Sequence, residues 1–159
     1  MREVAVEIIV NGQRRPAAVE PRLTLADFLR ERCGLTGTHL GCEHGVCGAC
    51  TVLLDGAAIR ACLVFAVQAD RRDVTTIEGL GGEDGELSTV QRAFCDAHGL
   101  QCGFCTPGFV VSLTAFLRDH PDPSDDDLRG ALAGNLCRCT GYQGILRAAR
   151  LAADAGAGP

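Results

Sequence analysis

Ten cysteines in a chain of 159 residues constrain the fold more than any other feature of the sequence. Dense cysteine is most common in secreted disulfide scaffolds, but these are usually shorter than about 100 residues and follow a signal peptide. We expect no signal peptide, because the charged residues Arg2 and Glu3 precede an alternating segment with no small-residue cleavage site behind it. In a reducing compartment, clustered thiols more often bind metal than pair with one another. The cysteines therefore predict a cytoplasmic metal-binding protein.

Charge and hydropathy exclude two kinds of partner. The 20 acidic residues outnumber the 15 basic ones and give a formal net charge of -5. A nucleic-acid-binding protein needs a basic face, and the sequence has none. The longest apolar stretches, around residues 62–67 and 108–117, fall short of the roughly 18 to 20 residues of a membrane helix. We therefore expect no nucleic acid and no membrane span.

The first half of the chain, residues 1–80, combines short strands with one helix. Alternating apolar residues and the hairpin turns Asn11-Gly12 and Asp55-Gly56 predict the strands, and Thr24 is a typical residue to begin a helix. The strands are expected over residues 4–10, 16–20, 51–54, 57–60 and 74–77. A sheet packed on one helix is a small α+β unit and suits the plant-ferredoxin-like (β-grasp) plan.

The second half, residues 81–159, is helical. Helices are expected over residues 87–98, 107–118, 124–132 and 143–153, separated by Gly, Pro or Asn. Four helices of this length make a minimal four-helix bundle. The segment 79–85, rich in Gly and acidic residues, is the expected linker between two domains, so the predicted fold class is α+β with two units.

The first group of cysteines predicts an iron–sulfur loop. Cys42, Cys47 and Cys50 have the C-x4-C-x2-C spacing of plant-type [2Fe-2S] ferredoxins, and glycines between them allow backbone N–H groups to turn toward the sulfur atoms. Zinc also accepts four thiolates, although zinc sites mostly use two C-x2-C pairs. Cys62 follows sooner than the fourth ligand of plant ferredoxins, so spacing alone leaves it open. With four cysteines present, the two histidines of a Rieske centre are not needed, and we interpret His39 and His44 as loop residues.

A second group forms another candidate metal site. Its members are Cys102, Cys105, Cys137 and Cys139, which lie at the boundaries of expected helices. Alone, this group fits zinc or an iron–sulfur cluster equally well, but the iron–sulfur loop expected earlier in the chain favours a second cluster. The remaining two, Cys33 and Cys95, fit the pattern of small core residues better than that of ligands.

Three segments around these cysteines carry a distinctive pattern. Residues 41–52 have the sequence GCEHGVCGACTV, residues 101–108 have QCGFCTPG, and residues 135–142 have NLCRCTGY. Together they closely resemble the small iron–sulfur subunit of the xanthine oxidase family of molybdenum hydroxylases, as in carbon monoxide dehydrogenase. The similarity extends over nearly the whole chain, from about residue 4 to residue 151.

The resemblance implies two [2Fe-2S] clusters with all eight ligands. The first is held by Cys42, Cys47, Cys50 and Cys62 in the ferredoxin-like domain. The second is held by Cys102, Cys105, Cys137 and Cys139 in the helical domain. In this family Gln101 matches a glutamine that hydrogen-bonds the pterin, and Cys139 matches the ligand closest to it. Arg138, between two of these cysteines, is a candidate for tuning the cluster potential, although a solvent-facing position fits it equally well.

The resemblance also implies partners and a role. Molybdenum-pterin belongs to a large subunit and FAD to a medium subunit, in a dimer of heterotrimers. The chain would pass electrons one at a time from molybdenum through both clusters to FAD. No residue has the character of a general base or nucleophile, so we expect a non-catalytic subunit of an oxidoreductase. The substrate, whether carbon monoxide, an aldehyde, a purine or another N-heterocycle, is not encoded here. The alternatives are a zinc-stabilised binding module and a free-standing ferredoxin.

Overall fold

The computed structural model describes residues 2–82 and 85–156, and its first half is built around one mixed sheet. The spatial strand order is β2-β1-β5-β3-β4, and only the β1–β5 pair is parallel. The strands are β1 (Val4–Val10), β2 (Gln13–Val19), β3 (Thr51–Leu54), β4 (Ala57–Arg60) and β5 (Asp73–Thr75). Asn11 and Gly12 take the positive φ angles, 49° and 75°, that the predicted hairpin turn requires.

A short helix packs on this sheet. Helix α1 (Leu25–Asp27) begins where Thr24 accepts a hydrogen bond from the Asp27 N–H at 3.1 Å, and it continues as a wider turn over Phe28–Arg32. Three single 3-10 turns, too short for a periodic pattern, follow at Ala61–Leu63, Ala66–Ala69 and Ile77–Gly79. The core between helix and sheet includes the fully buried residues Ile8, Val19, Leu25, Leu29 and Val74.

The prediction of a strand over residues 74–77 is wrong at its C-terminal end, because β5 stops at Thr75. The side-chain oxygen of Asn11 accepts the Thr76 N–H at 2.9 Å, so this N–H does not take part in the sheet ladder. The strand expected over 16–20 instead occupies Gln13–Val19, directly after its turn.

Over residues 85–156 the second half holds four helices, each within two residues of its expected range. They are α2 (Thr89–Asp96), α3 (Thr106–Asp119), α4 (Asp125–Leu132) and α5 (Gln143–Asp154). Ser88 and Ser124 each accept a hydrogen bond from the N–H three residues later, which fixes where α2 and α4 begin. The expected linker over residues 79–85 includes residues 83–84, which lie outside the described part of the chain.

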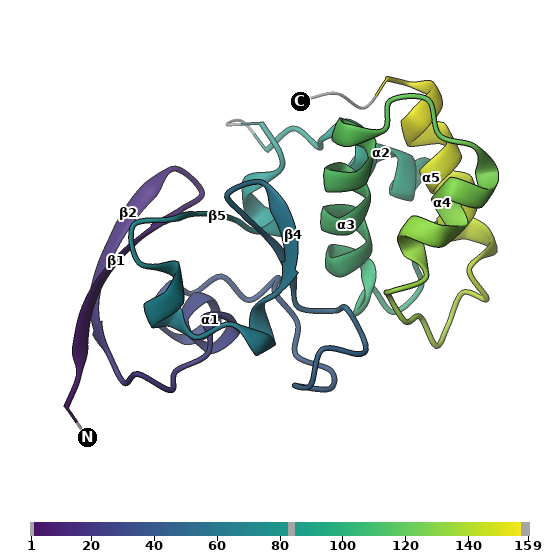
Figure 1. The fold of residues 1–159 in the computed structure, drawn as a ribbon. Helices are drawn as coiled ribbons and strands as arrows, with labels where there is room; N and C mark the ends of the chain where they lie inside the picture. Colours follow the sequence, from purple (N-terminus) through teal and green to yellow (C-terminus); the bar gives the residue numbers. More distant parts are fainter. Residues whose placement is uncertain (1, 83–84, 157–159) are drawn as a thin grey trace.

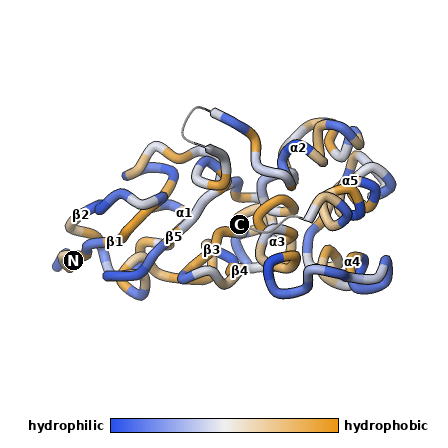
Figure 2. The backbone as a smooth tube through the Cα atoms, turned by 90° about the horizontal axis from the view of Figure 1, so that it is seen from above, coloured by the Kyte–Doolittle hydropathy of each residue, from blue (hydrophilic) through white to orange (hydrophobic). Residues whose placement is uncertain are grey.

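Helix α3 is the central element of the molecule (Figures 1 and 2). One side of it packs among the other helices through Phe109, Leu113 and Leu117. The other side places Val111 and Ala115 against Leu53 of β3. Because both faces are covered, α3 fixes the helical half against the sheet. Over residues 2–82 and 85–156, none of the helices combines the length and the hydropathy of a membrane span.

Candidate metal centres

The first cysteine loop, between α1 and β3, turns backbone N–H groups toward sulfur. Glu43, Gly45 and Gly48 have positive φ angles of 56°, 84° and 75°. In this conformation the Cys47 N–H donates to the Cys42 Sγ at 3.4 Å. Hydrogen bonds from the N–H groups of Cys47 and His44 lower the pKa of the Cys42 thiol to about 6. The loop therefore stabilises negative charge on the Cys42 sulfur through its own N–H groups.

The other two thiols of the first group are buried beside each other. Cys50 lies just before β3, Cys62 lies in the turn after β4, and the Ala61 N–H donates to the Cys50 carbonyl at 3.2 Å. Burial raises the pKa of Cys50 to about 12, and its thiol also contacts that of Cys62. A bound metal ion would deprotonate such thiols despite their burial. The structure thus places the thiol of Cys62, which spacing alone left open, beside that of Cys50.

The second group assembles from the loop before α3 and the loop between α4 and α5. The Sγ atoms of Cys102 and Cys139 are 3.4 Å apart, and the thiols of Cys105 and Cys137 contact each other. Burial raises the pKa of Cys137, but hydrogen bonds lower it by more, so the net shift is downward. The Thr140 hydroxyl and N–H donate to its Sγ at 3.1 and 3.4 Å, and the Cys139 N–H and the Cys105 thiol add to this effect. The second group of thiols therefore also accepts hydrogen bonds at sulfur.

The arrangement of the thiols fits a binuclear cluster. They approach in four pairs: Cys42 with Cys47, Cys50 with Cys62, Cys102 with Cys139, and Cys105 with Cys137. Each iron of a [2Fe-2S] cluster takes two protein ligands, so two pairs serve one cluster. Within residues 2–82 and 85–156, no three His, Cys, Asp or Glu side chains converge on one point as a single-ion site requires.

The first cysteine loop directly contacts the loop between α4 and α5, which carries Cys137 and Cys139; we refer to these as the two cysteine loops. The Leu136 N–H, beside Cys137, donates to the Cys47 carbonyl at 2.9 Å. The Asn135 side-chain amide donates to the Gly48 carbonyl at 3.1 Å. Sequence reasoning missed Asn135, although it is 2% exposed and the second residue before Cys137. A polar residue inside a cysteine motif was the available signal, but its partner lies 87 positions away.

The remaining residues considered from the sequence lie around the centres. Gln101 is exposed beside Cys102, and Arg138 is exposed as well. His39 stacks on Phe104, with ring centroids 4.8 Å apart, and its Nδ1 donates to the Phe104 carbonyl at 2.7 Å. This histidine therefore joins the two halves of the molecule rather than approaching a thiol.

The expectation that Cys95 belongs to the core is wrong, because its side chain is exposed. The buried face of α2 consists of Val90, Ala93 and Phe94. Cys95 follows Phe94 by one position, which turns it about 100° away from that face. Cys33, in contrast, packs against the core of the first half as expected.

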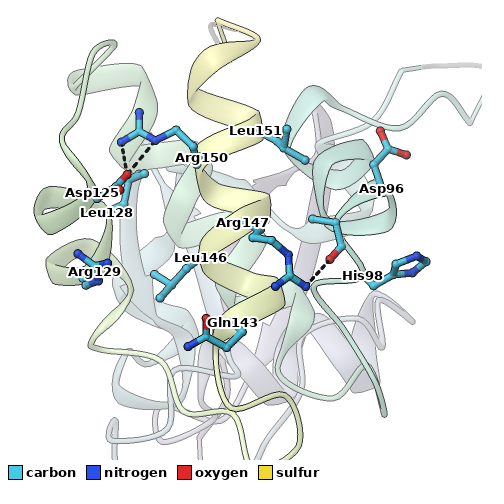
Figure 3. Close-up of a pocket in the computed structure, with 11 residues that line it drawn as sticks. Asp96, His98, Asp125, Leu128, Arg129, Gln143, Leu146, Arg147, Arg150 and Leu151 are labelled. Carbon is cyan, nitrogen blue, oxygen red and sulfur yellow. Dashed lines mark hydrogen bonds and ion pairs between the residues drawn. The ribbon is translucent and has the colours of Figure 1, made fainter.

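A cavity of about 670 Å³ lies away from both centres, between the end of α2, α4 and α5 (Figure 3). None of the cysteines lines it. Two of its arginines already have partners: Arg150 pairs with Asp125 at 2.7 Å, and Arg147 donates to the Ala97 carbonyl at 3.5 Å. The cavity therefore adds nothing to the chemistry of the thiols.

Fold and thiol pairs together define the class, a protein with two [2Fe-2S]-binding domains. Residues 8–78 match the family described as "2Fe-2S iron-sulfur cluster binding domain", and residues 76–150 match that described as "[2Fe-2S] binding domain". The chain belongs to the small iron–sulfur subunits of the xanthine oxidase family of molybdenum hydroxylases and dehydrogenases. The predicted ferredoxin-like first half is thereby confirmed, and the two domains support two [2Fe-2S] clusters.

Individual relatives support this placement. The chain is 56% identical over 145 residues to the nicotine 6-hydroxylase small subunit of Paenarthrobacter nicotinovorans, covering 91% of this chain and 87% of that one. It is 53% identical over 146 residues to the caffeine dehydrogenase subunit gamma of Pseudomonas sp. (strain CBB1), covering 90% and 87%. The structure of quinoline 2-oxidoreductase from Pseudomonas putida 86 matches with a TM-score of 0.92 and 46% identity, over 98% of this chain and 97% of that one.

Proposed function

We propose that this subunit carries electrons one at a time from a molybdenum-pterin centre on a large subunit to FAD on a medium subunit. The hydrogen bond from Leu136 to Cys47 carries the proposal, because it joins the two cysteine loops without an intervening residue. When bound, each [2Fe-2S] cluster can accept and release one electron. The chain's own contribution is to hold the two clusters close together and to set their reduction potentials through hydrogen bonds to sulfur.

Eight cysteines would hold the clusters. Residues 1–80 would hold one through Cys42, Cys47, Cys50 and Cys62. Residues 81–159, as a four-helix bundle, would hold the other through Cys102, Cys105, Cys137 and Cys139. The thiol pairs and the N–H groups directed at sulfur support this assignment.

Each centre has an open edge on which a partner can dock. Cys102, Cys139 and Gln101 are exposed at the second centre, where we place the contact with molybdenum-pterin. At the first centre, Val46 is 57% exposed in the loop over the thiols, where we place the FAD subunit. Exposed apolar side chains beside a redox site suit a partner interface. Electrons would therefore enter at one edge and leave at the other.

The assembly would be a dimer of heterotrimers in the cytoplasm, where the ten cysteines, all free in the structure, remain reduced. The relatives named for nicotine, caffeine and quinoline support an N-heterocycle as substrate of the complex. The substrate pocket would belong to the large subunit, and this chain would contribute no catalytic residue.

Metal analysis of the purified subunit tests the proposal. We expect a brown protein with about four irons per chain and, on reduction, two distinguishable [2Fe-2S] EPR signals, because the two groups of thiols differ in burial and hydrogen bonding. The native complex should also co-elute with FAD and pterin on size exclusion. A colourless, zinc-containing chain would contradict the proposal.

Replacing Gln101 by alanine tests the expected contact with the pterin. In the complex, we expect reduction of the clusters by substrate to slow by about tenfold, equivalent to ~1.4 kcal/mol of activation free energy. The EPR signals of both clusters should keep their shape and intensity, since Gln101 is exposed and supplies no thiol. Gln13→Ala, at an exposed position in β2, is the matched control. Loss of the second cluster's signal would show that Gln101 is needed for cluster binding instead.

A further inference from the structure

One backbone oxygen lies at the centre of the contact between the two cysteine loops. The Gly48 carbonyl, between Cys47 and Cys50, accepts hydrogen bonds from the Thr51 hydroxyl at 2.6 Å and the Thr51 N–H at 3.2 Å. Its third donor, the Asn135 side-chain amide at 3.1 Å, comes from the other half of the molecule. A single atom of the first loop is therefore held by both domains.

Both polar atoms of the Asn135 side chain are hydrogen-bonded, which fixes its orientation. While its Nδ2 donates to Gly48, its Oδ1 accepts a hydrogen bond from the Ser112 hydroxyl of α3 at 3.1 Å. The side chain is 2% exposed, so loss of either bond leaves a buried polar group unsatisfied. Because the next residue, Leu136, also bonds to the first loop, two consecutive residues tie the loops together.

Arg60 makes a second connection from the end of β4. Its guanidinium donates to the Gly134 carbonyl at 2.6 Å and to the Thr51 hydroxyl at 2.5 Å. The Thr51 hydroxyl in turn donates to the Gly48 carbonyl, so Arg60 supports the same contact between the loops as Asn135 does. This use of two nitrogen atoms in fixed directions needs a guanidinium, and lysine cannot reproduce it.

We propose that Asn135, supported by Arg60, is a positioning residue that fixes the separation of the two cluster-binding loops and thereby the rate of electron exchange between them. Electron tunnelling and the magnetic coupling of two unpaired spins both fall steeply with distance. A contact that prevents the loops from separating therefore acts on electron transfer itself as well as on stability. The proposal rests on the function proposed above, since it needs both clusters to be present.

The test uses the full-length chain with both clusters reduced by dithionite. In the unaltered chain we expect low-temperature EPR signals that are split by coupling between the clusters. Asn135→Ala should reduce this splitting, because the Leu136 and Arg60 hydrogen bonds that remain let the loops move further apart, while about four irons per chain stay bound. Each cluster should keep its own g values, since no thiol or thiol hydrogen bond has changed.

A matched control separates positioning from general stability. The Asn11 side chain also makes two hydrogen bonds, to the N–H and hydroxyl of Thr76 at 2.9 and 3.0 Å, but both stay within the first half. Asn11→Ala should lower the unfolding midpoint at least as much as Asn135→Ala and leave the splitting unchanged. Equal loss of splitting in both variants would show a structural effect only and would overturn the proposal.

Arg60→Lys serves as a second variant with its positive charge retained. We expect a partial loss of splitting, because the bond to Gly134 or to Thr51 is lost while Asn135 remains. If Asn135→Ala fails to retain iron, this variant decides, and an unchanged splitting in it overturns the proposal. Unsplit signals in the unaltered chain, with both clusters reduced, would do the same. An unaltered chain without iron would instead refute the proposed function.

Discussion

Replacing Cys47 by alanine is expected to stop electron delivery to FAD while substrate still reduces the second centre. The thiols approach in pairs, so loss of Cys47 leaves Cys42 without its partner on one iron. Iron should fall from about four to about two per chain, with the EPR signal of the first cluster missing. In the complex, substrate should then reduce the second cluster with no bleaching of the flavin.

Cys137→Ala should give the reverse pattern. The first cluster remains and is reduced by dithionite, but substrate no longer reduces it, because the centre between it and molybdenum is lost. Cys95→Ala is the control, since its exposed thiol belongs to neither group and its loss should leave iron content and turnover unchanged. Flavin reduction by substrate at the normal rate in the Cys47 variant would contradict the proposed order of the two centres.

The sequence was most informative where the signal is local. The spacing of Cys42, Cys47 and Cys50, with glycines between them, predicted a loop whose N–H groups meet sulfur, and the structure shows that geometry. Helix limits were also predicted well, because residues such as Ser88 and Ser124 fix a helix start within one turn of chain.

The sequence was least informative where partners are distant. The contact of Asn135 with Gly48 joins positions 87 apart, and no periodic pattern in the sequence indicates it. Similarly, β5 ends early because Asn11, 65 positions away, takes the Thr76 N–H. The exposure of Cys95 was missed for another reason: an apolar neighbour such as Phe94 does not indicate which face of the helix the next residue occupies.

Gly108, near the start of α3, is the position where one methyl group should have the largest effect on the contact between the domains. A Cβ there would lie 2.2 Å from the Gly48 carbonyl oxygen and 3.1 Å from the Ala49 Cα. Both neighbours belong to the backbone of the first cysteine loop, which cannot turn aside as a flexible side chain can. Gly108→Ala should therefore lower the free energy of unfolding by about 3 kcal/mol, at the upper end of overpacking effects.

The same chain offers a control at Gly130 in α4, where an added Cβ has no heavy atom within 4 Å. There, alanine reduces the conformational freedom of the unfolded chain and should raise the free energy of unfolding by roughly 0.4–1 kcal/mol. The two variants share the substitution and the helical setting, so opposite shifts in the urea midpoint report the contact of α3 with the first cysteine loop. Because the strain falls where α3 meets the first cysteine loop, Gly108→Ala should also weaken the EPR splitting, and Gly130→Ala should not. If the urea midpoint of Gly108→Ala is at or above that of the unaltered chain, α3 and the first cysteine loop can move apart at Gly108 without loss of stability.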